Sequence, residues 1–389
     1  MKITVISNFF NHHQKPIADE FYKQNAHNFC FIATEELPEE RANLGYHNMN
    51  SITPYVVCSY TSEADWMRCE KIAFESDVVI FGYGSAPLDL IKRRIAKNKL
   101  TFFYMERIFK KNNFSSVTLK RKFAVWYRHN FYSKKNVYIL CSSAYTSLDF
   151  FSLHLYKDKM YKWGYFPLSV CENEYRKVHT SNELNLLWVG RFIDWKHPEL
   201  AILTIKKLLA DGYSNLKLRM IGTGAMLQEM MELANKFHME DKIIFLNSMS
   251  PEQVREYMKK SDILLFTSDR NEGWGAVLNE AMDSGCVPIA NHMIGSVPYM
   301  IEHMNNGLIY DDNAEQPERI VECVKKLYDD RTLLMKLSKN AIKTIREKWN
   351  ANIAVCRFLN IVSNINSDNT YTDGPMSKAE IIEENFEIR

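Results

Sequence analysis

The sequence predicts an α/β protein made of two doubly wound domains, each a parallel sheet with helices on both faces. Short apolar runs alternate with longer helix-like patterns twice along the 389 residues, with six runs in each half. Continuous apolar strands separated by helices are typical of parallel sheets that are covered on both sides. The alternation stops once, at the polar, non-periodic residues 168–184, which we interpret as a linker. The length also fits two or three domains of about 150 residues.

The first half contains six strand-like runs. They are residues 3–7, 29–33, 55–58, 78–81, 101–104 and 137–141. Helical patterns separate most of these runs, for example around residues 17–23 and 88–97. A Gly- and Pro-bearing segment, residues 163–167, ends this half. We therefore expect residues 1–167 to form an N-terminal Rossmann-like domain.

The second half repeats the alternation with clearer boundaries. Its strand-like runs are residues 184–189, 216–221, 242–246, 263–267, 287–290 and 307–310. Its helical patterns are residues 197–210, 226–238, 251–260, 276–284, 316–329 and 331–348. We expect residues 185–349 to form a second Rossmann-like domain. Residues 366–389 are polar and predict a loosely held tail.

The formal net charge of +2 conceals a segregation of charge along the chain. Residues 1–167 hold 23 Lys and Arg against 15 Asp and Glu, whereas residues 168–389 hold 26 against 32. Residues 92–135 alone contain fourteen basic residues and ten aromatic ones, with Glu106 as the only acid. This composition favours an anionic partner, which is a membrane surface, a phosphate-bearing substrate or a nucleic acid. A solvated surface is the alternative interpretation.

The sequence favours a cytoplasmic protein. Its eight cysteines are scattered, without a Cys-x-x-Cys pair or zinc-ligand spacing, as expected for buried, reduced thiols. The first residues resemble a strand rather than a signal peptide, and no stretch approaches the roughly 20 apolar residues that cross a bilayer. The first strand lacks a following Gly-x-Gly-x-x-Gly, which argues against a nicotinamide oxidoreductase.

The most informative segment is residues 266–282, which contains Glu272 and Glu280. An apolar strand ends there, a loop follows, and a helix begins. In a doubly wound sheet, ligands bind beyond the carboxyl ends of the strands, and a helix N-terminus suits an anionic group. Gly273 and Gly275 would let a ligand approach the backbone closely. The alternative is that Glu272 is a helix-capping acid and Glu280 a solvated helix residue.

Two other segments follow strands of the second half. Gly190 ends one strand, and Arg191 and Lys196 flank the short loop before the next helix. Two cations in this position form a clamp for a diphosphate, or they are ordinary surface cations. The sequence Gly222-Thr-Gly224 is a weaker signal that marks a tight turn.

A histidine pair follows the first strand of the first half. His12 and His13, followed by Gln14, stand at the predicted mouth of the sheet. They are either acid–base or hydrogen-bonding groups, or loop residues without a chemical role.

Four phrases together resemble one enzyme family. V-G-R-F at 189–192, W-K-H-P-E-L-A-I at 195–202, I-G-T-G at 221–224 and E-G-W-G-A-V-L-N-E-A-M at 272–282 are similar to family 4 of the retaining glycosyltransferases. The resemblance covers residues 185–310 most strongly. It implies the GT-B fold, in which two Rossmann-like domains face a central cleft and a C-terminal helix, here about residues 350–365, crosses back to the first domain. N-H-H-Q and Y-K-W-G-Y-F-P in the first half resemble the bacterial capsule and surface-polysaccharide branch.

The resemblance also implies roles for individual residues. Arg191 and Lys196 would neutralise the donor diphosphate, Glu280 would bind the donor ribose, and Glu272 would contact the donor sugar at the reacting face. The other donor-binding residues that it implies are Gly190, Gly222, Asn247, Met249, Gly273, Trp274, Gly275, Ala276 and Val277.

The first domain departs from the family pattern. Many relatives carry a histidine at a later strand end, and the corresponding segment here, residues 104–107, has none. The candidates for contacting the reacting sugar from this side are therefore His13, His12 and Glu106. Gln14 and Arg107 lie next to them in the sequence and complete the predicted acceptor side.

The sequence therefore predicts a retaining, metal-independent hexosyltransferase that uses a UDP- or GDP-sugar and no cofactor. The absence of an Asp-x-Asp motif agrees with a reaction without a metal. The predicted acceptor is a lipid-linked intermediate of a bacterial surface polysaccharide. Residues 92–135 would contact the anionic inner face of the plasma membrane, and no nucleic acid is expected. The alternatives are a transferase for a soluble small-molecule acceptor and a catalytically inactive regulatory protein that binds sugar nucleotides.

Overall fold

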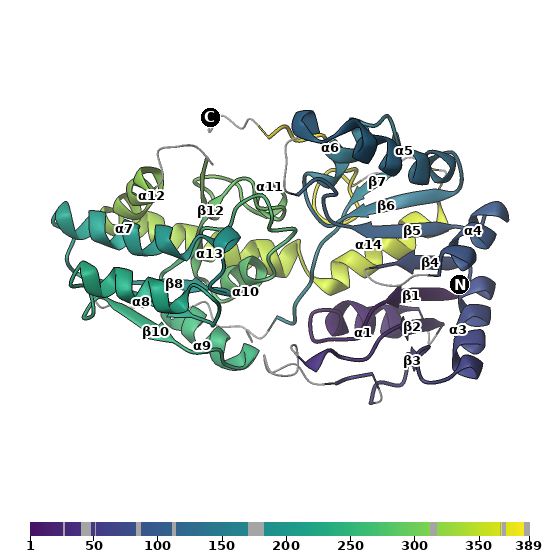
Figure 1. Cartoon of the computed structure of the whole chain (residues 1–389), viewed down its shortest axis with the longest axis horizontal. Coiled ribbons are helices and arrows are strands. Elements are labelled where there is room, and N and C mark those ends of the chain that lie inside the picture. The colour runs from purple at the N-terminus through teal and green to yellow at the C-terminus, as the bar shows by residue number, and fades with distance from the viewer. Residues whose placement is uncertain are drawn as a thin grey trace. The chain divides into compact units, whose positions relative to one another are not determined.

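The computed structural model describes residues 1–25, 28–39, 48–50, 52–82, 87–110, 114–169, 183–311, 317–365, 367 and 371–384. The chain folds into two compact units (Figure 1). Unit 1 comprises Met1–Leu168 and Trp349–Glu383, and unit 2 comprises Ser169–Lys348 and Glu384–Arg389. Most of the predicted linker, residues 170–182, lies outside the described residues.

Unit 1 contains a parallel sheet in the order β3-β2-β1-β4-β5-β6-β7. Its strands are β1 Ile3–Ser7, β2 Phe29–Ala33, β3 Val56–Cys58, β4 Val78–Phe81, β5 Thr101–Met105, β6 Val137–Cys141 and β7 Met160–Lys162. The chain winds outward from β1 in both directions, so the prediction of a doubly wound sheet is confirmed. The seventh strand, β7, was not predicted, because three residues are too few to show an apolar pattern.

Helices cover both faces of this sheet. They are α1 Lys15–Gln24, α3 Glu63–Glu75, α4 Leu88–Ala96, α5 Leu119–Ser133, α6 Thr146–Phe151 and α14 Ala351–Ser363, with a 3-10 turn at Phe114–Ser116. Successive side chains of a strand point to opposite faces. Phe102 of β5 accordingly packs on Phe358 of α14, with ring centroids 5.0 Å apart, whereas Phe103 packs on Tyr132 of α5 at 6.0 Å. Both faces of the sheet are therefore apolar, because neighbouring apolar residues of a strand pack on helices at opposite sides.

Helix α14 belongs to unit 1, although it follows unit 2 in the sequence (Figure 1). Its Phe358 also meets Phe21 of α1, with ring centroids 5.3 Å apart. At its first turn, the backbone carbonyl oxygen of Asn352 accepts a hydrogen bond from the side-chain amide of Gln24 at 3.3 Å. The C-terminal helix therefore completes the face of the first sheet that α1 covers.

The described part of the tail is not loosely held, so that prediction is wrong for residues 371–383. The backbone N–H of Lys162 in β7 donates to Ser377, and the N–H of Met376 donates back to Lys162, both at 2.8 Å. Lys378 forms an antiparallel bridge with Tyr161, and Met376 is fully buried. The polar composition concealed this arrangement, because backbone groups rather than apolar side chains satisfy the open edge of β7.

Unit 2 contains a second doubly wound parallel sheet in the order β10-β9-β8-β11-β12-β13. Its strands are β8 Leu184–Val189, β9 Leu216–Ile221, β10 Ile243–Leu246, β11 Ile263–Phe266, β12 Val287–Asn291 and β13 Leu308–Tyr310. Its helices are α7 Pro198–Ala210, α8 Leu227–Lys236, α9 Pro251–Lys260, α10 Val277–Asp283, α11 Val297–Met300, α12 Glu318–Asp329 and α13 Arg331–Glu347, with a 3-10 turn at Asp194–Lys196. All six predicted strands are present. An apolar core lies between this sheet and α7, α8 and α12.

The basic segment of residues 92–135 does not form one solvated surface. Arg94 of α4 is fully buried, and its guanidinium donates to the carbonyl oxygens of Ala73 (2.6 Å), Phe74 (3.2 Å), Ser76 (2.9 Å) and Leu100 (3.0 Å). The first three carbonyls lie at or just beyond the C-terminus of α3, where a cation is electrostatically favoured. Arg94 therefore has a structural role.

We expect Arg94→Met to lower the free energy of unfolding by about 3 kcal/mol, because the buried carbonyl groups lose their donors while the aliphatic stem is kept. Urea denaturation measures this change. Lys92→Met on the exposed side of the same helix is the matched control and should change stability by less than about 0.5 kcal/mol. Equal effects of the two substitutions would contradict a structural role for Arg94.

Candidate functional site

The loops that follow β8 and β11 meet at the centre of the second sheet. These strands are neighbours, and the winding direction of the sheet reverses between them. Ligands of doubly wound sheets bind at this reversal point, beyond the carboxyl ends of the strands. The two loops carry the predicted donor residues Gly190, Arg191, Lys196 and Glu272. The structure thus places residues from distant parts of the sequence at one ligand-binding position.

Lys196 and Glu272 form an ion pair between these two loops. Both side chains are largely buried, with 14% and 10% of their surface exposed. Ser268 also donates a hydrogen bond to the same carboxylate oxygen of Glu272, at 3.1 Å. The pair fixes the orientation of both charged groups. The alternative that Glu272 is a helix-capping acid has no support in the structure, because among the described residues no side chain caps the N-terminus of α10.

Arg191 differs from Lys196 in being exposed. Its guanidinium lies 6.0 Å from the centre of the Trp195 ring, and Lys196 lies over the same ring at 4.6 Å. Among the described residues, no carboxylate lies within ion-pair distance of Arg191. An exposed guanidinium next to a buried ammonium provides two positive charges for one anionic ligand.

Hydrogen bonds hold the two loops at a fixed separation. The indole N–H of Trp188 donates to the Thr267 hydroxyl at 2.9 Å, and that hydroxyl donates to the carbonyl oxygen of Lys196 at 2.7 Å. The backbone N–H of Asp269 donates to Trp195 at 3.0 Å. Thr267 and Asp269 were not predicted as site residues, because their role is to position the backbone of Lys196 rather than to contact a ligand.

His197 adds a charged connection between the same loops. Its ring lies 3.6 Å from the Asp269 carboxylate and 2.8 Å from the Glu199 carboxylate. The carboxylates of Asp269 and Glu199 raise the pKa of His197 to about 10, because both favour the charged imidazolium. The residue is therefore a cation at neutral pH.

We expect the contribution of His197 to stability to depend on pH. A raised folded-state pKa stabilises the folded state fully below the unfolded value of about 6.5, and the contribution is lost as pH rises towards about 10. His197→Asn keeps a residue that tolerates the left-handed backbone (φ 47°). The stability difference from wild type, measured by urea denaturation, should be large at pH 6 and small at pH 10. His238→Asn, at an exposed position with φ 53°, should show no such trend.

Gly222 is required by the packing between loops. Its φ is +141°, and a Cβ atom there would lie 2.0 Å from the carbonyl oxygen of Gly190. At Gly275, with φ +81°, a Cβ would lie 2.3 Å from the Phe266 ring and 3.2 Å from Cγ of Glu272. These glycines let the strand ends and the Glu272 loop approach one another. Gly222 therefore acts through the backbone of Gly190, whatever contact it makes with a ligand.

The segment after Glu272 turns partly inward. Trp274 is almost fully buried, and its indole N–H donates to the Asn279 side chain at 2.8 Å. Gly273 is also buried, whereas Ala276 and Val277 at the start of α10 are half-buried. The Trp274 side chain thus supports the loop from the inside, which leaves the backbone as the part of the segment able to meet a ligand.

Glu280 lies in a buried cluster of charges. Its carboxylate is 3.8 Å from Arg255 of α9, which also lies 3.4 Å from Asp283. Burial raises the pKa of Glu280 to about 7, while the charge of Arg255 opposes the increase. Such a carboxyl group can donate or accept a hydrogen bond near neutral pH. Arg255 and Asp283 were not predicted as site residues, because no pattern in the sequence indicates that α9 packs against α10.

Two of the predicted donor-binding residues, Asn247 and Met249, lie after β10. Asn247 is exposed and Met249 is half-buried. Between them, the hydroxyl groups of Ser248 and Thr223 lie 3.1 Å apart, which joins this loop to the turn at Gly222. Both predicted residues are thus on the strand-end side of the same sheet as Lys196.

In unit 1, the histidine pair lies at the end of β1 as predicted. The rings of His12 and His13 are tilted by 46° with centroids 3.9 Å apart, and His13 meets the Tyr165 ring edge-on at 6.2 Å. Gln14 donates a hydrogen bond to the Ser7 hydroxyl at 3.2 Å. The tyrosine follows β7 and was missed because its strand was missed.

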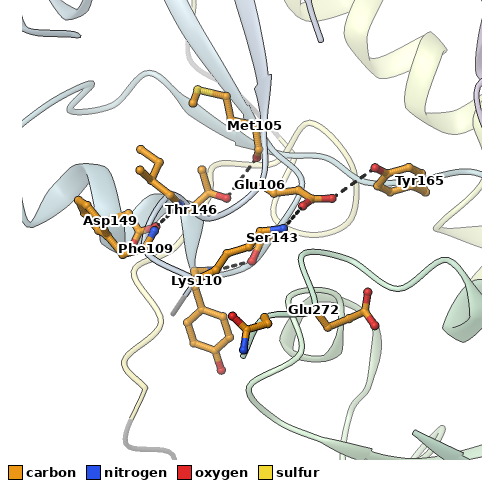
Figure 2. A network of polar contacts seen from close by, with 12 residues as sticks. Met105, Glu106, Phe109, Lys110, Ser143, Thr146, Asp149, Tyr165 and Glu272 are labelled. Atoms are coloured by element: carbon orange, nitrogen blue, oxygen red, sulfur yellow. Dashed lines mark hydrogen bonds and ion pairs between the residues drawn. The ribbon is translucent and has the colours of Figure 1, made fainter. Parts of the chain in front are cut away.

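Tyr165 connects the histidines to Glu106. Figure 2 shows Glu106 between Tyr165 and Lys110. The Tyr165 hydroxyl donates to one carboxylate oxygen at 3.3 Å, and the Lys110 ammonium donates to the other at 2.6 Å. Burial, followed by the neighbouring Tyr104 and Glu106, raises the pKa of Tyr165 well above its usual range. Two predicted acceptor-side residues, His13 and Glu106, are thus joined through one buried phenol.

Arg107 has a different environment from Glu106. It is 2% exposed, and its guanidinium lies over the Tyr145 ring at 4.6 Å. The next two backbone N–H groups, of Ile108 and Phe109, donate to the buried carboxylate of Asp149 at 2.6 and 3.1 Å (Figure 2). Arg107 and Asp149 therefore fix the loop that presents Glu106. A buried guanidinium in this position does not offer an open contact for an acceptor, contrary to the prediction.

The described part of the chain offers no cluster of three or more His, Cys, Asp or Glu side chains that could hold a metal ion. Within the same residues, no helix is both long and apolar enough to cross a membrane.

Comparison with known proteins identifies the class of protein that this fold and site define. Residues 172–344, which make up most of unit 2, match the model of the glycosyl transferases group 1 family. The predicted resemblance to glycosyltransferases with the GT-B fold is confirmed.

Two curated relatives illustrate the match. An uncharacterized glycosyltransferase of Methanocaldococcus jannaschii is 26% identical over 258 residues, which are 65% of this chain and 60% of the relative. The N-acetyl-alpha-D-glucosaminyl L-malate synthase of Bacillus anthracis is 24% identical over 191 residues, 49% of this chain and 48% of the relative. The chain thus matches about half of the length of these relatives.

Two solved structures share the fold over nearly the whole chain. HepE of Anabaena, solved in complex with UDP, superposes with a TM-score of 0.69 at 13% identity, covering 94% of this chain and all of HepE. The lipopolysaccharide outer core galactosyltransferase WaaB has a TM-score of 0.67 at 15% identity, with 94% and 100% coverage.

Proposed function

We propose that the chain is a retaining glycosyltransferase that moves a sugar from a UDP- or GDP-sugar to an acceptor hydroxyl, without a metal ion or cofactor. The observation that carries the proposal is the buried Lys196–Glu272 pair at the reversal point of the second sheet, with Arg191 exposed next to it. The match of residues 172–344 to the glycosyl transferases group 1 family supports it. HepE has been solved with UDP-glucose, which makes UDP-glucose the first donor to test.

In this proposal, unit 2 stabilises the departing diphosphate. The bond between the sugar and the diphosphate breaks with the electron pair passing to the phosphate oxygen, so negative charge grows there. Lys196 and Arg191 would offset that charge from fixed positions. Pairing with Glu272 keeps Lys196 oriented before the ligand arrives, which reduces reorganisation during the reaction.

Retention follows from attack on the face that the diphosphate leaves. The acceptor hydroxyl oxygen forms the new bond to the anomeric carbon, and its proton passes to the departing phosphate oxygen. Glu272 then orients the donor sugar and is not a nucleophile. Glu280, whose pKa of about 7 allows it to accept or donate a hydrogen bond, would bind the ribose.

For the acceptor, we propose a lipid-linked glycan intermediate bound by unit 1, near His12, His13 and Glu106. The structural neighbour WaaB is named as a lipopolysaccharide outer core galactosyltransferase, which agrees with such an acceptor. The second candidate is a soluble small acceptor, since the name of the Bacillus anthracis relative contains L-malate. Transfer to a polyprenyl-linked glycan, compared with transfer to hydroxy acids under the same conditions, separates the two.

The experiment that tests the proposal combines binding and turnover. UDP, GDP, ADP and their sugars are compared in a thermal-shift panel, because a ligand that binds the folded state raises its melting temperature. The bound donor is then followed by NMR for hydrolysis or transfer, with and without EDTA. We expect one nucleotide to bind, the α- or β-configuration of the donor to be kept in the product, and EDTA to have no effect.

Glu272→Gln separates an enzyme from a binding protein. We expect this variant to retain nucleotide binding and to lose transfer by at least about a hundredfold. Binding without turnover in the wild type, with every acceptor tried, would favour an inactive regulatory protein. Absence of a thermal shift with every nucleotide and sugar nucleotide would overturn both the transferase and the regulatory binding protein.

A further inference from the structure

We propose that the outer face of α5 docks on an anionic lipid bilayer. Its exposed apolar side chains are Leu119, Phe123, Trp126, Tyr127 and Phe131, with 82%, 62%, 37%, 74% and 51% of their surface exposed. We call these five residues, with the basic side chains of Lys120, Arg121, Lys122, Arg128 and Lys134 around them, the α5 face. The proposed membrane docking goes beyond the proposed transfer reaction and does not depend on it.

Helix geometry places the apolar members of the α5 face in one stripe. Leu119, Phe123, Tyr127 and Phe131 follow one another at intervals of four residues, which is the spacing of neighbours on a helix surface. The Phe123 ring stacks on Trp126 at 5.8 Å and on Tyr127 at 6.2 Å. The stripe is therefore continuous along the helix and is not a set of isolated exposed residues.

The opposite side of α5 already has a partner within unit 1. His129 and Tyr132 are buried, and the imidazole Nδ1 of His129 lies 2.9 Å from the Tyr156 hydroxyl. Helix α5 therefore has buried side chains on the side that packs within unit 1 and a second, exposed apolar stripe. None of the five apolar residues of the outward stripe is buried.

The charges around the stripe indicate the occupant. No acidic residue occurs between Glu106 and Asp149. Lys120, Arg128 and Lys134 are exposed on or beside α5, whereas Arg121 is held by the carbonyl oxygen of Ile108 at 3.1 Å and still projects from the same helix. Aromatic side chains enter the interfacial region of a bilayer while adjacent cations attract anionic headgroups.

Other occupants fit the same charges less well. A second copy of this chain would bring two basic α5 faces together, which like-charge repulsion disfavours. A nucleic acid would satisfy the cations and could stack on aromatic rings, but it would leave the aliphatic Leu119, the most exposed member of the stripe, without an apolar partner. A bilayer offers anionic headgroups to the basic side chains of the α5 face and an apolar region to both its aromatic and its aliphatic side chains.

The test measures co-sedimentation of the full chain with vesicles of phosphatidylcholine alone or with 30% phosphatidylglycerol. We expect binding to the anionic vesicles to be at least about tenfold tighter than to the neutral ones, and to weaken as salt is raised. The triple variant Phe123→Ser, Tyr127→Ser, Phe131→Ser should lose about tenfold or more in affinity at low salt. Lys120→Ser with Lys134→Ser should lose the preference for anionic lipid.

Matched controls keep the test interpretable. Met67→Ser removes an equally exposed apolar side chain, 62% exposed, from α3, and Lys336→Ser removes an exposed cation from α13. Both should bind vesicles as the wild type does. The thermal shift with the donor nucleotide, measured on every variant, reports folding and the donor site separately from membrane binding.

Three results would overturn the proposal. The first is equal or absent binding to anionic and neutral vesicles, and the second is unchanged binding by the triple variant. The third is tighter binding to single-stranded oligonucleotides than to anionic vesicles at the same salt, which would assign the face to nucleic acid.

Discussion

Replacing Lys196 with alanine is expected to lower the rate of sugar transfer by two to three orders of magnitude. Loss of a preorganised charge at the developing diphosphate raises the barrier by about 3–4 kcal/mol. The substitution also leaves the buried Glu272 carboxylate without its cation, next to the position of an anionic ligand. Steady-state kinetics with the donor identified by thermal shift measure the effect, and both kcat and the affinity for donor should fall.

A double-mutant cycle separates the two causes. If the loss in Lys196→Ala came only from the unpaired Glu272, adding Glu272→Gln would restore most of the donor affinity. If Lys196 acts on the diphosphate, the donor affinity of the double variant stays as low as that of Lys196→Ala. Lys207→Ala on α7, whose ammonium pairs with Glu318 at the surface, is the control for removing a paired lysine and should keep wild-type rates. Wild-type transfer by Lys196→Ala would remove Lys196 from the mechanism.

Gly222→Ala is expected to unfold or strongly destabilise unit 2, by about 3 kcal/mol or more. The new methyl group would lie 2.0 Å from the carbonyl oxygen of Gly190, and the backbone at φ +141° is unfavourable for any residue with a Cβ atom. The strand end that carries Gly190 and Arg191 would have to move. Thermal and urea unfolding measure the loss, and donor binding should fall with it.

Gly212→Ala supplies the matched control. Gly212 also has a positive φ, +88°, but a Cβ atom there would meet nothing within 4 Å. Its substitution should therefore cost only the backbone strain, about 1 kcal/mol. Equal destabilisation by the two substitutions would show that φ alone, and not the close approach of two loops, accounts for Gly222.

Most of the fold was predicted from the sequence, because strands buried in a parallel sheet consist of short apolar runs. The strand from residue 216 to 221, for example, was predicted with its observed bounds, and so was the helix from residue 251 to 260. Strand β7 and the tail segment bonded to it were missed, since each is short and they are joined through backbone hydrogen bonds that leave no side-chain pattern.

The candidate site was predictable where the chain itself brings residues together. Lys196 and Glu272 could be placed at strand ends, because strand ends of a parallel sheet meet at one edge. Tyr165, Asp149 and Arg255 could not, since each depends on packing between elements that are distant in sequence. Charge counting likewise grouped Arg94 with the α5 cations, although burial gives Arg94 a structural role and leaves the others at the surface.

Because unit 1 is built from two separate segments of the chain, the two units can complete their folds during translation only in a certain order. The sheet and helices of unit 2 are contained in residues 184–347, whereas unit 1 needs helix α14 and the tail segment that pairs with β7, both of which follow these residues in the sequence. The first unit to begin synthesis is therefore the last that can finish folding, the reverse of the usual N-terminal-first order. A nascent chain that has emerged up to about residue 348 would hold every strand and helix of the second unit and a first unit whose α1 face and β7 edge are still uncovered.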